Sequence, residues 1–305
     1  AAASAVSAGE PQPGVPVSAS VGTYTNPVLG RCADPVVLRH GDWYYAYCTY
    51  APRKADRFHG IRVYTSSDLV HWADRGYALK HSDSWGEKAF WAPDIVERDG
   101  IFFLYYSAET RLCVATAADP LGPFRQAVQT PMEPDFLRID PHVFEDDDGQ
   151  RYLYFVRFRR GNRIWGARLN DDMISIDVSS ARLLVKPDRP WEKRSGRIVE
   201  GPEIIKHRGL YYLTYSGSHF NDPAYAVGYA VSEHPLGPFR KYENNPILCG
   251  TGDVSGTGHH CLTESPDGTE RFIVYHRHAA PGRIHPRQMA IDRIRFLSRP
   301  DGPDR

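Results

Sequence analysis

The sequence lacks a surplus of charge of either sign. Lysine plus arginine number 37, and aspartate plus glutamate also number 37. A balanced chain has no overall field that would attract nucleic acid or an anionic membrane, so we expect neither as a partner. Long apolar runs are also missing, because none approaches the roughly 20 residues that a membrane span requires. These absences favour an uncharged partner in solution.

Cysteine is scarce as well. The five cysteines are Cys32, Cys48, Cys113, Cys249 and Cys261. They form an odd set without CxxC spacing, so neither a zinc site nor a full disulfide framework is indicated. At most, two disulfide bridges are compatible with this set.

Turn-forming and aromatic residues are plentiful. The chain contains 26 Gly, 24 Pro, 18 Tyr, 13 Phe and 6 Trp. Aromatic residues favour strands, and Gly and Pro favour tight turns. We therefore expect many short strands and little helix.

One pattern recurs five times along the chain: a short motif with an acid or its neighbour beside Pro or Gly, then a turn with Gly, then an aromatic strand. The copies open at Asp34-Pro35, Pro93-Asp94, Asp140-Pro141, Glu200-Gly201-Pro202 and, in degenerate form, His259-His260-Cys261. Their aromatic strands contain Tyr44–Tyr47, Phe102–Tyr106, Tyr152–Phe155, Tyr211–Tyr215 and Phe272–Tyr275. A strand-rich period of roughly 46 to 62 residues is typical of blades repeated around an axis. The sequence predicts an all-β protein with the fold of a five-bladed β-propeller.

The propeller is expected to occupy residues 22–297 as one domain. Residues 1–21, rich in Ala, Ser, Pro and Gly, are predicted to be disordered, and they are similar to a mature N-terminus or a linker left after signal cleavage. Residues 298–305 are predicted to be a polar tail. Tyr24–Leu29 and Gln288–Phe296 remain to close the ring, and we expect them to share the last blade. We expect a monomer that is secreted or periplasmic.

The acids that open three of the copies are the candidate catalytic residues. The first strand of a propeller blade lines the central axis, so Asp34, Asp140 and Glu200 should converge at one mouth of the channel. Neighbouring carboxylates push their pKa values apart, so one can stay protonated as an acid while another is ionised as a base. This arrangement suits glycosidic bond hydrolysis. An Asp before Pro is also a common turn residue, and Asp94 is predicted to be such a structural acid that braces its blade.

The ordered motifs resemble those of glycoside hydrolase family 43 over about residues 25–297. They are Ala33-Asp34-Pro35, Phe90–Ile95, Ile139-Asp140-Pro141, Glu200-Gly201-Pro202, Gly256–His259 and Tyr275–His278. The resemblance implies an inverting mechanism, with Asp34 as the general base that activates water and Glu200 as the general acid. It implies that Asp140 raises the pKa of the acid and orients it.

The same resemblance implies three further site residues. Trp91 would form an apolar wall for the sugar, although a core tryptophan has the same sequence signature. Arg287 is similar to the family arginine that binds a sugar hydroxyl, with Arg277 and Arg283 as nearby alternatives. His259, with His260 as its rival, is similar to a histidine that lies beside a structural calcium or other ion in the central channel. No cofactor is expected to be required for the chemistry.

The favoured function is an exo-acting α-L-arabinofuranosidase on plant cell-wall glycans. A β-xylosidase, an endo-arabinanase or an exo-β-galactanase of the same family is the alternative. Because xylosidases of the family usually carry a C-terminal β-sandwich, a chain that stops after the fifth blade favours arabinose or galactose substrates. A non-catalytic carbohydrate-binding propeller would be expected to lack one of the three acids. The related sucrose and fructan enzymes open with an Asn-Asp-Pro-Asn-Gly type of motif, which Cys32–Pro35 does not contain.

Overall fold

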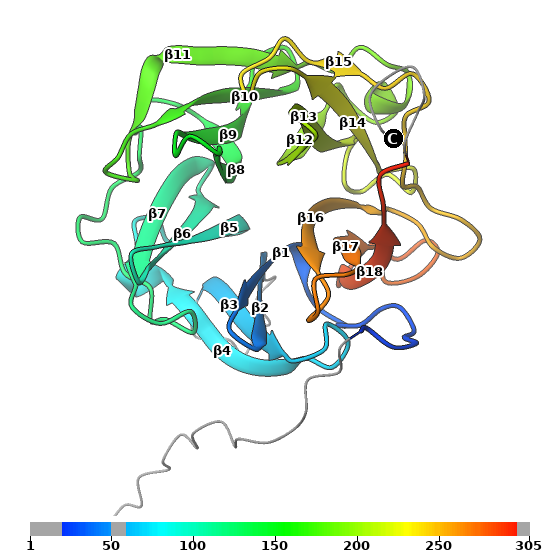
Figure 1. Cartoon of the computed structure of the whole chain (residues 1–305), viewed down its shortest axis with the longest axis horizontal. Helices are drawn as coiled ribbons and strands as arrows, with labels where there is room; N and C mark the ends of the chain where they lie inside the picture. The colour runs from blue at the N-terminus through cyan, green and yellow to red at the C-terminus, as the bar shows by residue number, and fades with distance from the viewer. Residues whose placement is uncertain (1–19, 50–58, 298–305) are drawn as a thin grey trace, which may run out of the picture.

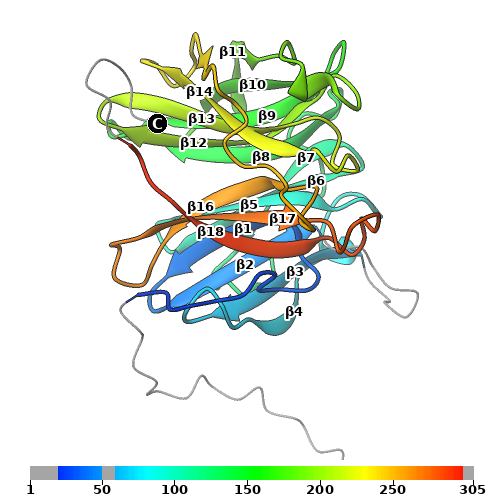
Figure 2. The same ribbon diagram turned by 90° about the vertical axis from the view of Figure 1, so that its right-hand side faces the viewer.

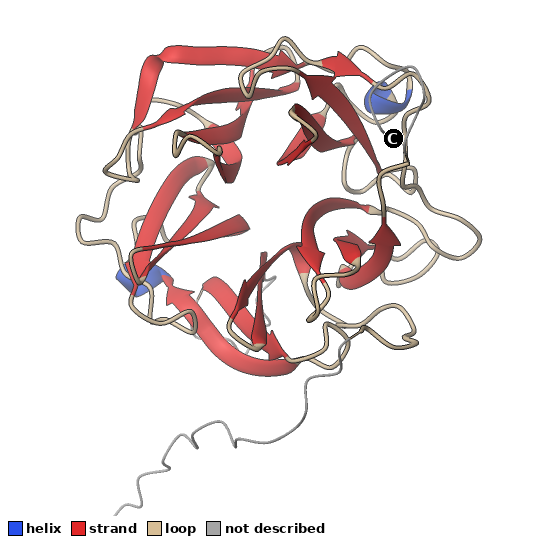
Figure 3. Cartoon of the chain, viewed as in Figure 1, coloured by secondary structure: helices blue, strands red, loops and turns tan. Residues whose placement is uncertain are grey.

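Five antiparallel sheets surround a central axis in the computed structural model, which describes residues 20–49 and 59–297 (Figure 1). That part of the chain contains no α-helix, only the single turns of 3-10 helix η1 (His81–Asp83) and η2 (Trp191–Lys193) (Figure 3). The predicted all-β, five-bladed propeller is confirmed.

Each sheet is one blade, and its first strand lies nearest the axis (Figure 1). Blade 1 contains β1 (Ala33–His40), β2 (Trp43–Thr49), β3 (Gly60–Ser66) and β4 (Ala73–Lys80). Blade 2 contains β5 (Trp91–Arg98), β6 (Ile101–Ala108) and β7 (Arg111–Ala117). Blade 3 contains β8 (Arg138–Glu145), β9 (Arg151–Phe158), β10 (Asn162–Leu169) and β11 (Ile176–Val185). Blade 4 contains β12 (Val199–His207), β13 (Leu210–Gly217), β14 (Ala226–Ser232) and β15 (Arg240–Lys241). Blade 5 contains β16 (Gly258–Glu264), β17 (Arg271–Arg277) and β18 (Gln288–Ile294).

Tight two-residue turns join the first two strands of several blades. Asp99 and Gly100 connect β5 to β6 with φ of 53° and 76°, and Arg208 and Gly209 connect β12 to β13 with φ of 49° and 76°. Two consecutive positive φ values match the right-handed twist of a hairpin, and Gly adopts one of them without steric cost. The glycines that recur in the sequence are therefore hairpin turns.

The aromatic strands form the core between blades. Tyr154 and Val156 of β9 pack in one buried cluster with Val199 and Tyr215 of blade 4. Leu153 and Phe155, on the opposite face of β9, pack in a second cluster with residues of blade 2. Each strand thus buries both faces, which is why these strands are apolar or aromatic at consecutive positions.

Closure of the ring joins the two ends of the chain in blade 5. The backbone N–H groups of Val28 and Leu29 donate to the carbonyl of Met289 in β18. The Asn26 side chain donates to the carbonyl of Ile291 at 2.8 Å and accepts from its N–H at 3.0 Å. The expected sharing of the last blade by the two segments is confirmed for these residues.

Val21, expected in the N-terminal segment, and Phe296, expected in the last blade, both lie elsewhere. Val21 is buried and its carbonyl accepts from Arg293, so this residue of the predicted N-terminal segment packs with the propeller. β18 ends at Ile294, and the chain then crosses toward blade 4 (Figure 2). There Phe296 stacks on His207 with ring centroids 4.0 Å apart. Residues 1–19 and 298–305 lie outside the described residues.

All five cysteines are free thiols, and Cys249 alone among them is exposed. The sequence allowed two bridges, and the fold forms none. In the described ranges, no helix has the length and apolar character to span a membrane.

Candidate active site

A β-bulge near the start of every inner strand shapes the site. Each pairing register shifts there, and the bulged residue has positive φ: Asp34, Ala92, Asp140, Gly201 and His259. A bulge re-aims its side chain and is common next to active sites. Asp34 and Asp140 therefore occupy equivalent positions. Glu200 does not, because it precedes the bulged Gly201.

The backbone N–H at each bulge is satisfied by the preceding blade. Ala92 donates to Thr49, Asp140 to Ser107 and His259 to Ser216, each through a side-chain hydroxyl. Gly201 instead donates to the Asp140 carboxylate at 3.1 Å. Asp34 also departs from the hydroxyl pattern, because its N–H donates to Nδ1 of His276 at 3.3 Å. The bond from Gly201 ties Asp140 directly to the residue after Glu200.

A cavity of about 540 Å³ opens where these inner strands begin. All six residues predicted for the site line it: Asp34, Asp140, Glu200, Trp91, Arg287 and His259. They come from all five blades, and the sequence separates the most distant pair by 253 positions. The fold therefore brings together every predicted site residue.

Asp34 is surrounded by one guanidinium and by two imidazole rings whose pKa values are lowered by burial. Its carboxylate accepts two hydrogen bonds from Arg287, at 2.6 and 3.2 Å. Nδ1 of His276 lies 3.0 Å from it, and Nδ1 of His259 lies 3.3 Å from it. Burial alone would raise the pKa of Asp34, but Arg287 and the two histidines outweigh burial and hold this pKa well below its usual range. Asp34 is thus ionised at neutral pH.

Glu200 has the opposite protonation preference. Burial raises its pKa to about 7, although hydrogen bonds from Tyr225 and Asn162 act in the other direction. The Tyr225 hydroxyl donates to Oε1 at 2.9 Å, and the Asn162 amide donates to Oε2 at 3.1 Å. A carboxyl with this pKa retains its proton over much of the neutral range and can deliver it to a leaving group.

Asp140 is the third carboxyl of the cavity. Burial and the charge of Glu200 raise its pKa well above the usual value, because two close carboxylates resist ionising together. The N–H of Gly201 is its hydrogen-bond donor. Asp140 and Glu200 therefore titrate as a coupled pair beside an ionised Asp34.

This combination of one ionised and one protonated carboxyl in a single cavity is what acid–base cleavage of a glycosidic bond needs. Comparison with known families gives the same result, since the model for glycosyl hydrolases family 43 matches residues 24–302. The chain belongs to this family. It is therefore a glycoside hydrolase, and a carbohydrate is its substrate.

Relatives in the family have different printed activities. The chain is 31% identical to the beta-D-galactofuranosidase xynD of Aspergillus niger over 89% of this chain and 82% of that protein. It is 28% identical to an extracellular exo-alpha-(1->5)-L-arabinofuranosidase of Streptomyces avermitilis, over 86% of this chain and 57% of that protein. Among solved structures, one titled endo-1,4-beta-xylanase from Bacteroides thetaiotaomicron superposes with a TM-score of 0.84 at 39% identity, over 91% of this chain and 94% of that one.

The predicted binding residues differ in their surroundings. Trp91 is 38% exposed on the cavity wall, so it is not a core tryptophan, and its contact with sugar stays a prediction. Arg287 is 9% exposed and its guanidinium lies 4.5 Å from the centre of the Phe220 ring. Its bonds to Asp34 give it a second role besides the predicted sugar contact: it keeps Asp34 ionised. The alternatives Arg277 and Arg283 do not line the cavity.

His259 lines the cavity, whereas its rival His260 is buried against Thr214 at 2.7 Å. The described residues contain no group of three or more His, Cys, Asp or Glu side chains placed to hold a metal. Calcium takes six to eight oxygen ligands, and the Asp34 carboxylate next to His259 is already bonded to Arg287. These residues do not fit a calcium ion held by protein ligands. An ion at His259 stays a prediction in which water supplies the remaining ligands.

Several site residues were not predicted from the sequence. Tyr225 and Asn162 hold Glu200, and His276 approaches Asp34. Tyr225 and Asn162 lie at the start of the third strand of their blades, where the other copies have different residue types, so the repeat gives no signal for them. His276 was detectable in principle, because it occupies in blade 5 the position that Thr49 occupies in blade 1. His276 pairs with Gly258, and Thr49 pairs with Ala33.

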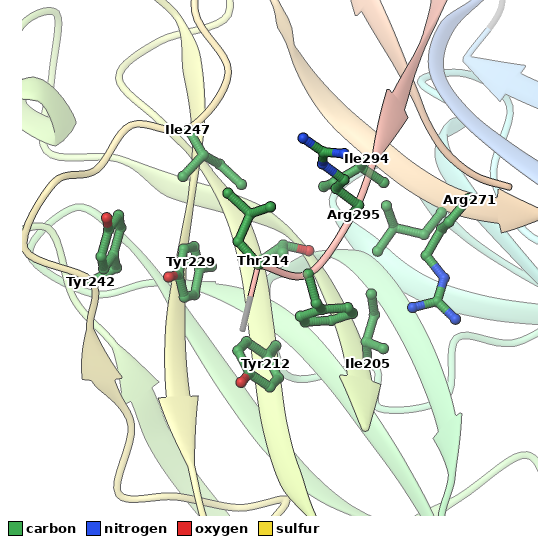
Figure 4. Close-up of a pocket in the computed structure, with 12 residues that line it drawn as sticks. Ile205, Tyr212, Thr214, Tyr229, Tyr242, Ile247, Arg271, Ile294 and Arg295 are labelled. Carbon is green, nitrogen blue, oxygen red and sulfur yellow. The ribbon is translucent and has the colours of Figure 1, made fainter. Parts of the chain in front are cut away.

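A second cavity, of about 310 Å³, lies between blades 4 and 5 (Figure 4). Its wall includes Tyr212, Tyr229, Tyr242 and Phe296. No carboxylate is present among the described residues that line it. It therefore has no groups for acid–base cleavage, and the chemistry belongs to the axial cavity.

Proposed function

We propose that the protein is an inverting, exo-acting α-L-arabinofuranosidase. Asp34 would activate the water, Glu200 would protonate the leaving oxygen, and Asp140 would keep the pKa of the acid high. The observation that carries this proposal is the different surroundings of the two buried carboxyls. Two hydrogen bonds from the Arg287 guanidinium favour an ionised Asp34, whereas Glu200 is buried with only the neutral donors Tyr225 and Asn162.

Each proton has a defined path in this mechanism. The ionised Asp34 takes a proton from water as the water oxygen attacks the anomeric carbon. Glu200 gives its proton to the glycosidic oxygen as that bond breaks, and the pair then exchanges protons with solvent. Inversion needs room for the water, so we expect the two carboxyl groups to lie about 6.5 to 9.5 Å apart.

The named relatives support a furanose substrate. The Aspergillus and Streptomyces proteins are named for β-D-galactofuranose and α-L-arabinofuranose. These two sugars share the configuration around the ring and differ in the exocyclic group. A cavity that accepts one ring is therefore suited to accept the other.

Xylan cleavage is the second candidate, because the Bacteroides structure with 39% identity is titled an endo-xylanase. A panel of 4-nitrophenyl glycosides separates the candidates: α-L-arabinofuranoside, β-D-galactofuranoside, β-D-xylopyranoside and β-D-galactopyranoside. We expect the highest kcat/KM on the arabinofuranoside. Faster hydrolysis of the xyloside would reject the proposal in favour of a xylosidase. No hydrolysis of any member would reject exo action, and would leave an endo-acting enzyme or a non-catalytic propeller.

We also propose that the protein acts outside the cytoplasm as a monomer. The Streptomyces avermitilis and Streptomyces chartreusis relatives are named extracellular enzymes, which supports export. Expression of the native gene in its host, with immunoblots of the culture medium and periplasm, tests the location. Light scattering of the purified chain tests the monomer.

A further inference from the structure

The position of the acid fixes the side of the cavity on which the leaving group lies. A general acid must lie within hydrogen-bond reach of the oxygen that it protonates. The sugars that depart with that oxygen therefore lie next to Glu200. Asn162 of blade 3 and Ile198, just before β12, line the cavity on this side.

Phe158 is an exposed aromatic residue at this place. Its side chain is 43% exposed, and it lines the cavity together with Asn162, with which it pairs across the β9–β10 hairpin. Alternation along β9 places Phe158 on the same face as Val156 and Tyr154. Those two residues are buried against blade 4 in a cluster that includes Val199, the neighbour of Glu200. Phe158 therefore continues the blade 3–blade 4 interface up to the mouth of the cavity.

The turn that carries Phe158 is held against blade 4. The N–H of Asn162 donates to the carbonyl of Arg197 at 2.9 Å. A Cβ on Gly161, whose φ is 101°, would lie 2.2 Å from that carbonyl oxygen, so only glycine permits this approach. The backbone beside Phe158 is thus positioned before any ligand binds, which lowers the entropic cost of stacking on its ring.

We propose that Phe158 is the platform for the first sugar of the leaving group. This inference rests on the proposed function, in which Glu200 is the acid. An exposed ring beside the acid presents an apolar face to the C–H groups of a sugar, and neighbouring polar groups bind its hydroxyls. Phe158 would thereby favour oligosaccharides over glycosides with a small leaving group.

Paired substrates isolate the contribution of the platform. One pair is α-1,5-L-arabinobiose and methyl α-L-arabinofuranoside. The other pair is β-1,4-xylobiose and methyl β-D-xylopyranoside. Each variant is assayed on the pair that the wild type hydrolyses. Phe158→Ala should lower kcat/KM on the disaccharide about tenfold, mainly through KM, because a stacking contact is lost. Its kcat/KM on the methyl glycoside should stay within about twofold of wild type, and Phe158→Tyr should match the wild type on both.

Phe136→Ala is the matched control. Phe136 is 41% exposed in the same blade, but it contacts Arg157, whose side chain is on the opposite face of β9, and it does not line the cavity. Phe136→Ala should not change the ratio of kcat/KM on the disaccharide to kcat/KM on the methyl glycoside. If Phe158→Ala does not fold, Phe158→Leu removes the ring with little loss of apolar volume.

Equal losses on both substrates, no loss on the disaccharide, or the same selective loss in Phe136→Ala would each overturn the platform. A wild type that hydrolyses none of the four glycosides contradicts the proposed function itself, and the platform falls with it. Failure of the two proposals is therefore distinguishable.

Discussion

Arg287 determines the chemistry of Asp34 more than any other single residue. It donates two hydrogen bonds to the Asp34 carboxylate, and both side chains are buried. A buried ion pair costs desolvation, and removing one partner leaves an uncompensated charge. Asp34 is therefore both the proposed base and a counter-charge that the fold needs.

This double role separates the effects of two substitutions. Asp34→Asn and Glu200→Gln should each lower kcat by about 10²- to 10⁴-fold, because each removes one proton transfer. Glu200→Gln should melt near the wild-type temperature. Asp34→Asn should lose about 3 kcal/mol of unfolding free energy, because Arg287 keeps its charge without a partner.

Steady-state kinetics and urea unfolding measure the two effects, with exposed Asp135→Asn as the control. Retention of more than about a tenth of the activity in either variant would remove that residue from the general acid–base pair.

The neighbours of Glu200 should move the alkaline limb of the pH profile in opposite directions. Activity should fall as pH rises through about 7, where Glu200 loses its proton. If Asp140 keeps the pKa of the acid high as proposed, Asp140→Asn leaves Glu200 without a second carboxyl that competes to ionise, so the pKa of Glu200 should fall and the limb should move to lower pH. Tyr225→Phe removes a hydrogen bond that favours the carboxylate, so the limb should move to higher pH. Profiles of kcat/KM test both shifts, and movement of both limbs in the same direction would contradict this electrostatic account.

At the scale of the element, the bulged inner strands place two layers of polar residues along the axis. Asp34 and Asp140 lie at bulges and belong to the first layer. Asp94, His142 and Glu203 form the second layer, each two residues after the bulge of its own strand. Nδ1 of His142 lies 3.6 Å from Asp94 and 3.5 Å from Glu203. Asp94 also accepts from the N–H of Val143 at 2.7 Å, so it braces blade 2 against blade 3 as predicted.

Asp94→Asn tests this brace through the pH dependence of stability. Burial opposes the charge of His142, but Glu203 and Asp94 outweigh burial and raise the pKa of His142 to about 9. The stabilisation from this raised pKa is fully present below the unfolded value of about 6.5 and is lost as pH rises through about 9. Glu203 is the larger cause of this rise and Asp94 the smaller, so removing the Asp94 carboxylate should weaken the stabilisation without abolishing it.

The variant should therefore be about 3 kcal/mol less stable than wild type at pH 6, and the difference should shrink by pH 10. Urea unfolding at both values measures it. If the difference in unfolding free energy is the same at both pH values, the hydrogen bond to Val143, and not the charge of Asp94, is what stabilises the fold.

The repeat made the fold and the three carboxyls predictable, because an acid beside Pro or Gly opens four of the five copies and an aromatic strand follows in all five. It did not predict the partners of those carboxyls. Arg287 is 253 positions from Asp34 in sequence, and Tyr225 is 25 positions from Glu200, at a place where the other blades have no tyrosine. Alignment of the copies by their acids also obscured the bulge, since Glu200 precedes the bulged residue whereas Asp34 and Asp140 occupy it. Side-chain contacts between blades depend on this register, which only the fold reveals.

At the scale of the whole molecule, the N-terminal segment closes the ring. Asn26 forms two hydrogen bonds with the backbone of Ile291, and thereby extends the pairing of Val28 and Leu29 with β18. Asn26→Ala should lower the free energy of unfolding by about 1 to 3 kcal/mol, because it removes two bonds and leaves Ile291 backbone groups unpaired.

Thermal or urea unfolding checks the contribution of Asn26, with Asn244→Ala on the exposed surface as the control. A variant as stable as wild type would show that the strand pairing closes the ring without Asn26.

The stereochemistry of the product tests the central claim most directly, because it depends on the whole arrangement of Asp34, Glu200 and the space between them. Proton NMR in the first minutes of hydrolysis, before mutarotation mixes the anomers, identifies the sugar that forms first. If Asp34 activates water and never bonds to the sugar, the first product has the anomeric configuration opposite to that of the substrate. Retention of configuration would require a covalent intermediate and carboxyl groups only about 5 to 5.5 Å apart, and it would contradict the role of Asp34 as a base.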